Sequence, residues 1–349
     1  DRIAKVTAAD VNRVAEHYFK PSNRTIGRFE PTATPDRAEI AAAPTPTEAL
    51  QGYTGRVAEA AGEAFDTSAA NIDKRTETFM IGDGLKVSLL RKDTRGDKVQ
   101  VNATFRFGDV EALRPVPRMA ASFAGNLLMS GSETMRREEI AKRFEALKTN
   151  ASVSGGPQSA GISLDTRRET LAQALALAAD VLRHPAYPAS EFEQQRLQWT
   201  TGMEASRQEP ASVASQAMGR HFDPWPAGHP FAFHSLDENL AALRALKRED
   251  VVAFHRDFYG TATGEIAVIG DFDPAEVKAQ LKTLFADWRS PKPFRNTLET
   301  HHDVAAERRQ IETPDKANAV LLARLNLALN QDDADYPALV IANRILGMG

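Results

Sequence analysis

The chain has 349 residues, of which 42% are apolar, so it is long enough for two domains of ordinary size with buried cores. Its 43 basic and 47 acidic residues give a formal net charge of -4 and do not form the basic stripe that nucleic-acid binding normally requires. The lack of cysteine excludes disulfides, thiolate metal sites and cysteine nucleophiles together. No apolar run approaches the roughly 20 residues of a membrane-spanning helix. We therefore expect neither a nucleic-acid partner nor a membrane span.

The first part of the chain predicts a helix, a strand and a linker. Thr7 to Phe19 follow a helical pattern with Thr7 as the N-cap, and Thr25 to Phe29 predict a short strand. From Pro31 to about Asp73 the composition shifts to Ala, Pro, Thr and Glu, which predicts an extended linker. The chain begins without a methionine and ends just after an apolar helical pattern, so we expect both ends to be cuts in a longer protein.

The remainder predicts a hairpin followed by alternating helices and strands. Glu77 to Ile81 and Leu85 to Leu90 flank Gly82-Asp83-Gly84, which is a hairpin signal, and Lys98 to Phe107 alternates as a third strand. Three prolines between 224 and 230 mark a loop. Further helices are expected at about 116–129, 136–147, 168–183, 189–207, 248–258 and 274–286, and further strands at about 160–164 and 264–270.

An internal repeat organises this pattern. The helix-to-strand unit from Asp10 to Pro31 resembles the unit from Asp250 to Pro274, at a shift of about 240 residues. The first 30 residues therefore look like the tail of a preceding copy. Chance similarity between two unrelated units is the alternative, because helix-to-strand units are common in α+β proteins.

The histidines do not form a recognisable metal motif. None of the eight lies in an H-E-x-x-H or H-x-x-E-H arrangement. His301 and His302 are adjacent and predict a loop pair, whereas His17 and His255 occupy comparable helices and predict surface or packing roles. No G-x-S-x-G motif is present, and Gly155-Gly156 predicts a bend between strand segments. The residues alone give no complete active site.

The order of several segments resembles a known family. These segments are Arg106 to Glu111, Leu127 to Ser132, Gly228 to Pro230, Leu246 to Val251 and Val268 to Pro274. Together they resemble the pitrilysin-like, or inverzincin, zinc metallopeptidases, which include the mitochondrial processing peptidases. The likeness covers nearly the whole chain. It implies an α+β fold in which helices pack on a mostly antiparallel sheet.

The resemblance also shows where a zinc site would lie. In active members the inverted motif stands just before the segment that matches Leu127 to Ser132. Here Ser122 and Asn126 replace the two histidines, and Gly125 replaces the glutamate that activates water. The third ligand, a glutamate about 75 residues later in the family, falls near Thr201 and Gly202. We expect no zinc and no catalytic residue at these degenerate positions, because none of them supplies a good ligand or a base.

The resemblance implies the inactive half of a zinc metalloendopeptidase, which helps to enclose and bind a peptide substrate. The zinc would lie in the catalytic half of the same polypeptide or in a homologous subunit. Its domains would be a family-domain tail at 1–30, a linker at 31–73, a zinc-less peptidase-like domain at 74–295 and the truncated start of the next family domain at 296–349. An exported or periplasmic location is favoured by the resemblance alone.

Two alternatives stay open at this point. One is a non-enzymatic scaffold that resembles the core subunits of respiratory complexes. The other is that the alignment is displaced and the chain hydrolyses peptides alone, in which case the isolated chain would bind stoichiometric zinc.

Overall fold

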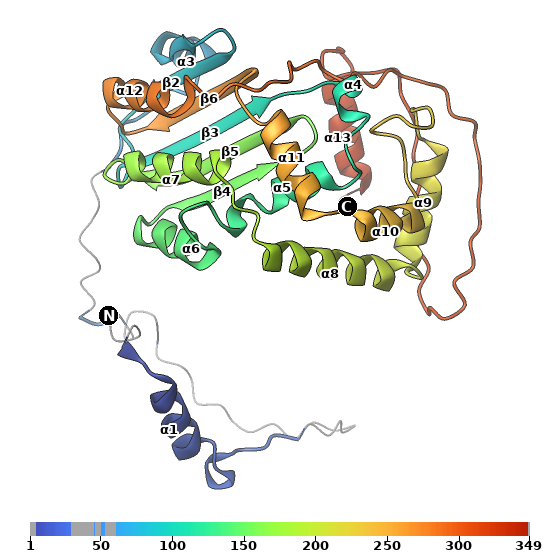
Figure 1. The fold of residues 1–349 in the computed structure, drawn as a ribbon, viewed down its shortest axis with the longest axis horizontal. Helices are drawn as coiled ribbons and strands as arrows, with labels where there is room; N and C mark the ends of the chain where they lie inside the picture. The colour runs from blue at the N-terminus through green and yellow to red at the C-terminus, as the bar shows by residue number, and fades with distance from the viewer. Residues whose placement is uncertain (1–4, 29–44, 46–49, 53–60, 348–349) are drawn as a thin grey trace. The chain divides into compact units, whose positions relative to one another are not determined.

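A six-stranded sheet with the order β1-β2-β6-β3-β5-β4 forms the centre of the larger of two compact units, Asp1–Ala58 and Glu59–Gly349 (Figure 1). The computed structural model describes residues 5–28, 45, 50–52 and 61–347. The strands are β1 Glu77–Ile81, β2 Leu85–Arg91, β3 Lys98–Arg106, β4 Asn150–Gly155, β5 Ser159–Arg167 and β6 Thr263–Gly270. Neighbouring strands are antiparallel except β2 and β6, which are parallel. The expected α+β fold is confirmed.

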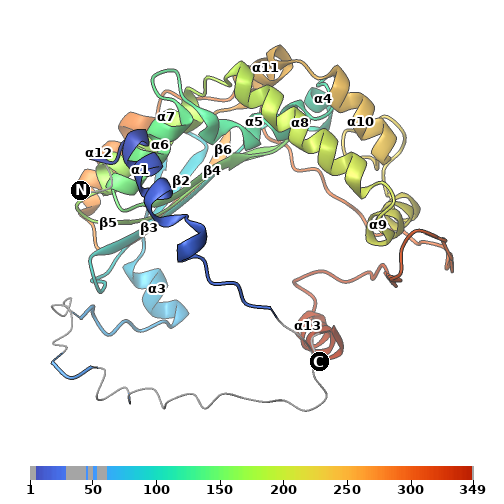
Figure 2. The same ribbon diagram turned by 90° about the horizontal axis from the view of Figure 1, so that it is seen from below.

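Period-two alternation gives the sheet two different faces. In β3 the apolar side chains from Val99 to Phe105 are buried, while Gln100 and Asn102 between them are exposed. Helices cover the apolar face, and α3 lies against β2 on the other side of the sheet (Figure 2). The helices of this unit include α3 Ala69–Arg75, α4 Val110–Leu113, α5 Ala120–Asn126, α6 Arg137–Ala146, α7 Leu171–Arg183, α8 Ala189–Ser206, α9 Pro210–His221, α10 Leu236–Ala245, α11 Arg248–Phe258, α12 Pro274–Phe285 and α13 Tyr336–Gly347.

Aromatic side chains join the helices to the sheet. The ring of Phe105 on β3 lies 5.1 Å from Phe285 and 5.2 Å from Trp288, at the end of α12. Phe107, just after β3, lies 4.8 Å from Tyr259, which follows α11. Aromatic pairs at such distances add about 0.5–1.5 kcal/mol each beyond the area that they bury. These contacts fix α11 and α12 on the buried face.

Several elements differ from the predicted ones. The helix predicted at 116–129 is shorter, because Met119 has a positive φ of 75° and α5 begins only after it. The helices α9 and α10 were not predicted, although Ser235 and Glu238 form a capping box at the start of α10. The helix α3 begins within the predicted linker at 31–73 and ends two residues beyond it, and Arg75 at its end pairs with Glu63 at 2.9 Å.

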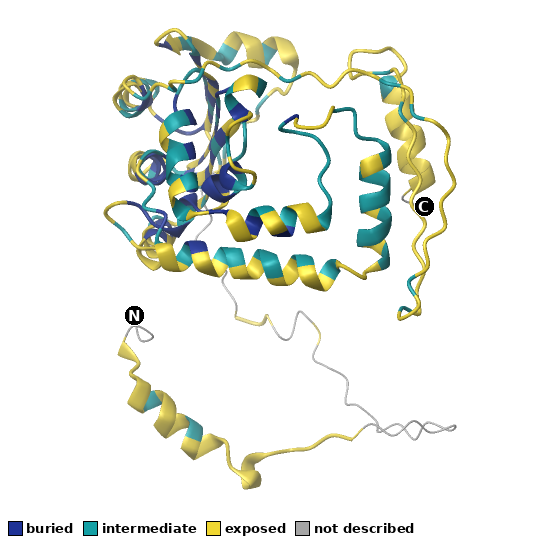
Figure 3. Cartoon of the chain, turned by 45° about the vertical axis from the view of Figure 1, so that its right-hand side comes forward, coloured by how far each residue is buried: buried dark blue, intermediate teal, exposed yellow. Residues whose placement is uncertain are grey.

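The smaller unit contains the predicted first helix, α1 Ala8–Tyr18, whose N-cap Thr7 accepts the Asp10 N–H. Residues 24–28 form no strand, and Phe29 lies outside the described residues. A strand needs a neighbouring strand for its backbone hydrogen bonds, and the six-stranded sheet does not include residues 24–28. The helix is exposed along most of its length (Figure 3). No described helix of either unit is long and apolar enough to cross a membrane.

Candidate functional site

The segment where the family resemblance places zinc forms α5. Small residues dominate this helix, which lets it pack closely on α11 and β4. Phe123 is the exception and reaches α8, where its ring lies 4.9 Å from Trp199 and 5.5 Å from Phe192. The structure thus brings together the two helices that carry the positions singled out in the sequence.

Gly125 lies where α5 meets the end of β4. A Cβ atom at Gly125 would stand 2.0 Å from the carbonyl oxygen of Gly155, far inside any real contact distance. Gly155 is itself enclosed, because a Cβ atom there would stand 2.1 Å from the hydroxyl oxygen of Tyr259. Gly125 of α5, Gly155 of β4 and Tyr259 after α11 therefore pack directly against one another. A glutamate at position 125 requires the backbone of β4 to move.

Ser122 and Asn126 lie one turn apart on α5. Ser122 is partly buried and Asn126 is exposed. The Asn126 Nδ2 atom donates a hydrogen bond of 2.8 Å to the Ser122 carbonyl oxygen, so the amide caps its own helix. The two side chains offer only neutral oxygen atoms to an approaching group.

Thr201 and Gly202 are both exposed on α8. A Cβ atom at Gly202 would have no neighbour within 4 Å. Glu204, three residues after Thr201, forms a surface ion pair with Arg244 at 2.9 Å. The α8 side of the arrangement therefore offers no metal ligand at the two predicted positions.

The residues present do not fit a zinc ion. Protein zinc sites use three or four His, Cys, Asp or Glu side chains, whereas this surface has a serine, a glycine and an asparagine on α5 and a threonine and a glycine on α8. Throughout the described part of the chain, no group of three such side chains is arranged to hold a metal ion.

A buried cluster of Tyr187, His255 and Tyr259 packs against α5. The Tyr187 hydroxyl donates to the Ala124 carbonyl oxygen at 3.2 Å, and burial raises the pKa of Tyr187. The Tyr259 hydroxyl is buried without a hydrogen-bond partner among the described residues, and burial also raises its pKa. His255 lies between them, with Nε2 2.9 Å from the Leu182 carbonyl oxygen. Its predicted packing role is confirmed.

Sequence reasoning missed this cluster as a unit. Tyr259 lies inside the repeat unit from Asp250 to Pro274 but was not singled out, and neither was Tyr187. The signal for Tyr187 was its place between Pro185 and Pro188, directly after a long apolar helix. No sequence pattern predicts the close contact between Gly125 and Gly155, because the two residues lie on different elements.

Residues 245–349 match the family model described as the peptidase M16 inactive domain. A search of curated protein sequences found no match. The chain is similar to the crystal structure of the peptidase M16 inactive domain from Pseudomonas fluorescens, with a TM-score of 0.60 and 23% identity over 78% of this chain and 65% of that one.

A second solved structure has the same fold. It is the putative M16-like peptidase from Alicyclobacillus acidocaldarius, with a TM-score of 0.50 and 17% identity over 62% of this chain and 51% of that one. The present chain thus spans between about half and two thirds of the length of these two proteins. The family model over residues 245–349 and the shared fold support the resemblance seen in the sequence, which is to an inactive C-terminal domain of a pitrilysin-like (M16) peptidase.

Proposed function

We propose that the chain is the non-catalytic half of a zinc metalloendopeptidase and that it binds an extended peptide while helping to enclose it. The zinc and the base that activates water belong, in this proposal, to the catalytic half of the same polypeptide or to a homologous subunit. The closed contact at Gly125 supports a binding role rather than hydrolysis at this helix. The observation that carries the peptide-binding role is the free edge of β4.

The hydrogen-bond pattern indicates which groups of β4 point outward. The strand pairs with β5 alone, and Gly156 beyond it donates to the Ser159 carbonyl oxygen at 2.7 Å. Because antiparallel residues alternate between bonded and non-bonded pairs, Ala151, Val153 and Gly155 direct their backbone groups away from β5. Within the described chain, no other residue bonds to the outward groups of Ala151 and Val153, whereas the Gly155 carbonyl oxygen faces Gly125 of α5.

The chemistry of this edge favours strand addition. The sequence Asn150 to Gly155 contains no proline and no charged side chain, which are the usual protections of a free sheet edge. Unprotected edges accept an extended peptide, with main-chain hydrogen bonds providing affinity. Gly155 lies against Gly125, so the edge ends beside α5. A bound peptide would therefore run past the degenerate positions.

The test compares two peptides on the full chain. The first is a fluorescent ten-residue peptide with acetylated and amidated ends, and the second carries N-methyl groups on alternate residues, which remove the donors that a strand needs. We expect the first to bind in an anisotropy titration and the methylated peptide to bind at least about tenfold more weakly, because several charge-neutral hydrogen bonds are lost. Equal binding of both peptides contradicts strand addition, and binding of neither favours the scaffold alternative.

A further inference from the structure

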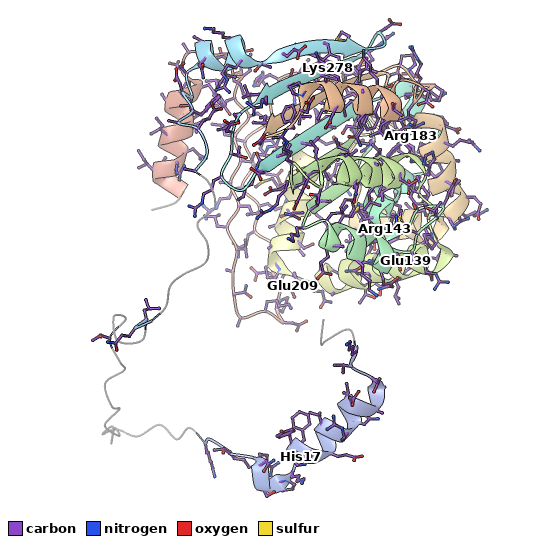
Figure 4. All side chains as sticks on the ribbon, turned by 90° about the vertical axis from the view of Figure 1, so that its left-hand side faces the viewer. His17, Glu139, Arg143, Arg183, Glu209 and Lys278 are labelled. Atoms are coloured by element: carbon purple, nitrogen blue, oxygen red, sulfur yellow. The ribbon has the colours of Figure 1, made fainter. Side chains whose placement is uncertain are left out.

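A groove of about 620 Å³ lies between α6 and α7, on the helix-covered side of the sheet (Figure 4, where Glu139 and Arg143 mark α6 and Arg183 marks the end of α7). Met135, Leu147 and Leu177 form its apolar floor, with an alanine from each helix. This volume is within the range of about 300–1,000 Å³ that is typical of small-ligand pockets. The groove shares no residue with α5 or with the outward edge of β4.

The two helices run in opposite directions along the groove. The end of α6 is tied to the start of α7, because Thr149 Oγ1 lies 2.7 Å from Thr166 Oγ1, which lies 3.0 Å from Thr170 Oγ1. The start of α6 is tied to the end of α7, since the Glu133 N–H donates to the His184 carbonyl oxygen at 2.9 Å. Each end of the groove therefore combines the start of one helix with the end of the other.

This arrangement places opposite charges at the two ends. Arg143, late in α6, lies toward Gln173, early in α7, while Asp180 lies toward Thr134 at the other end. Gln173 and Asp180 are two turns apart on α7, which corresponds to about 10 Å at a rise of 1.5 Å per residue. The groove thus has an apolar middle, one cationic end and one anionic end.

Each charged group of the groove has at least one polar atom without a partner among the described residues. Among the described residues, no hydrogen bond or ion pair reaches the Arg143 guanidinium. The Asp180 Oδ1 atom lies 3.2 Å from His184 Nδ1, whereas Oδ2 is buried and has no partner in the same part of the chain. An unpaired acceptor in such a position is costly unless another group satisfies it.

We propose that this groove binds a short apolar peptide with free termini, about three residues long. Its ammonium group meets Asp180, its apolar side chains cover Met135, Leu147 and Leu177, and its carboxylate meets Arg143. Arginine binds a carboxylate through two parallel hydrogen bonds, which gives the direction of the bound peptide. Three extended residues span about 10 Å, which matches the separation of the two ends.

The test is calorimetric titration of the full chain with the tripeptide Ala-Leu-Ala and with its acetylated and amidated form. We expect saturable binding of the free tripeptide. In methyl NMR spectra, the chemical shifts should change only for methyl groups that line the groove, such as that of Met135. The capped form is expected to bind at least about tenfold more weakly, because both charge-assisted contacts are lost. Equal binding of the two forms overturns the proposal, as does the absence of binding.

Substitutions test which end of the groove binds which terminus of the peptide. Asp180→Asn keeps the size of the side chain and removes its charge, whereas Arg143→Gln removes the charge with a shorter side chain. Each is expected to weaken binding about tenfold. Lys142→Gln removes a neighbouring cation of α6 that does not line the groove, so it is the matched control and should leave affinity unchanged. An equal effect of Lys142→Gln and Arg143→Gln contradicts recognition at this end. The outcome is separate from that of the β4 edge, which is tested with a peptide whose ends are capped.

Discussion

Gly125 is the residue on which the proposal of a non-catalytic half depends most directly. We expect Gly125→Ala to lower the free energy of unfolding by about 3 kcal/mol, because the added methyl group meets the Gly155 carbonyl oxygen in a packed site. The matched control is Gly202→Ala on α8, where nothing lies within 4 Å. That substitution should raise stability by about 0.5–1 kcal/mol, since alanine favours a helix over glycine.

Urea unfolding of the two glycine variants measures both effects. An unchanged stability of Gly125→Ala would show that β4 yields easily and that position 125 can accept a larger side chain. In that case a glutamate could also fit at this position, and only the chemistry of the residues present would speak against zinc binding.

His255 makes stability depend on pH. Burial lowers its pKa below the usual value near 6.5, with the neighbouring His184 acting in the same direction. The unfolded chain therefore binds a proton more readily, so this part of the stability is complete above about pH 6.5 and is lost as pH falls toward the folded pKa. Each unit by which folding lowers the pKa of His255 corresponds to about 1.4 kcal/mol in the free energy of unfolding.

The measurement is urea unfolding at pH 7.5 and pH 5.5 for the wild type and for His255→Gln. We expect the wild type to lose more stability between the two pH values than the variant does. The same loss in both proteins would assign the pH dependence to other groups, such as His234, whose pKa is also lowered by burial.

The chemistry at single positions could be predicted from the sequence, but the contacts could not. Ser122, Gly125 and Asn126 were found because they stand at fixed spacing before Leu127 to Ser132. The sequence shows that Gly125 has no base, yet only the structure shows that Gly155 closes the space. Such a contact joins residues that are 30 positions apart, and no local pattern encodes it.

Among the elements, β4 offers a sharp test of its own geometry. Ala151→Pro removes an N–H that points away from β5, so the ladder between β4 and β5 should survive with little change in stability. Ser152→Pro removes an N–H that points toward β5 and is expected to cost about 3 kcal/mol. Thermal unfolding of both variants checks the difference, and an equal loss in the two would show that the assigned alternation is wrong.

Elements with strong local signals were predicted within a few residues. The hairpin β1–β2, the strand β3 and the helix α8 agree with their predicted bounds to within one residue at most ends. Apolar periodicity and turn glycines determine such elements locally. The helices α9 and α10 were missed because the prolines and aromatic residues between them suggested one continuous loop. The length of α5 depends on the left-handed backbone of Met119, which no residue preference predicts.

At the scale of the whole molecule, the predicted internal repeat is supported at its helices. Helix α1 and helix α11 are both 11 residues long. In each helix, the side chain of an aspartate three residues after the N-cap accepts a hydrogen bond from the N-cap backbone N–H. Asp10 accepts from Thr7 in α1, and Asp250 accepts from Lys247 in α11. They differ in burial: α11 buries Val251, whereas Val11 of α1 is 56% exposed. The assignment of residues 1–30 as the tail of a preceding family domain stays a prediction.

The central claim is the proposal that this chain binds peptide without hydrolysing it. The most direct measurement is the zinc content of the purified full chain by mass spectrometry, taken together with peptide cleavage before and after chelation. We predict less than stoichiometric zinc and no chelator-sensitive cleavage, because α5 and α8 provide no ligand set and no base. Stoichiometric zinc accompanied by cleavage that stops on chelation would contradict the account.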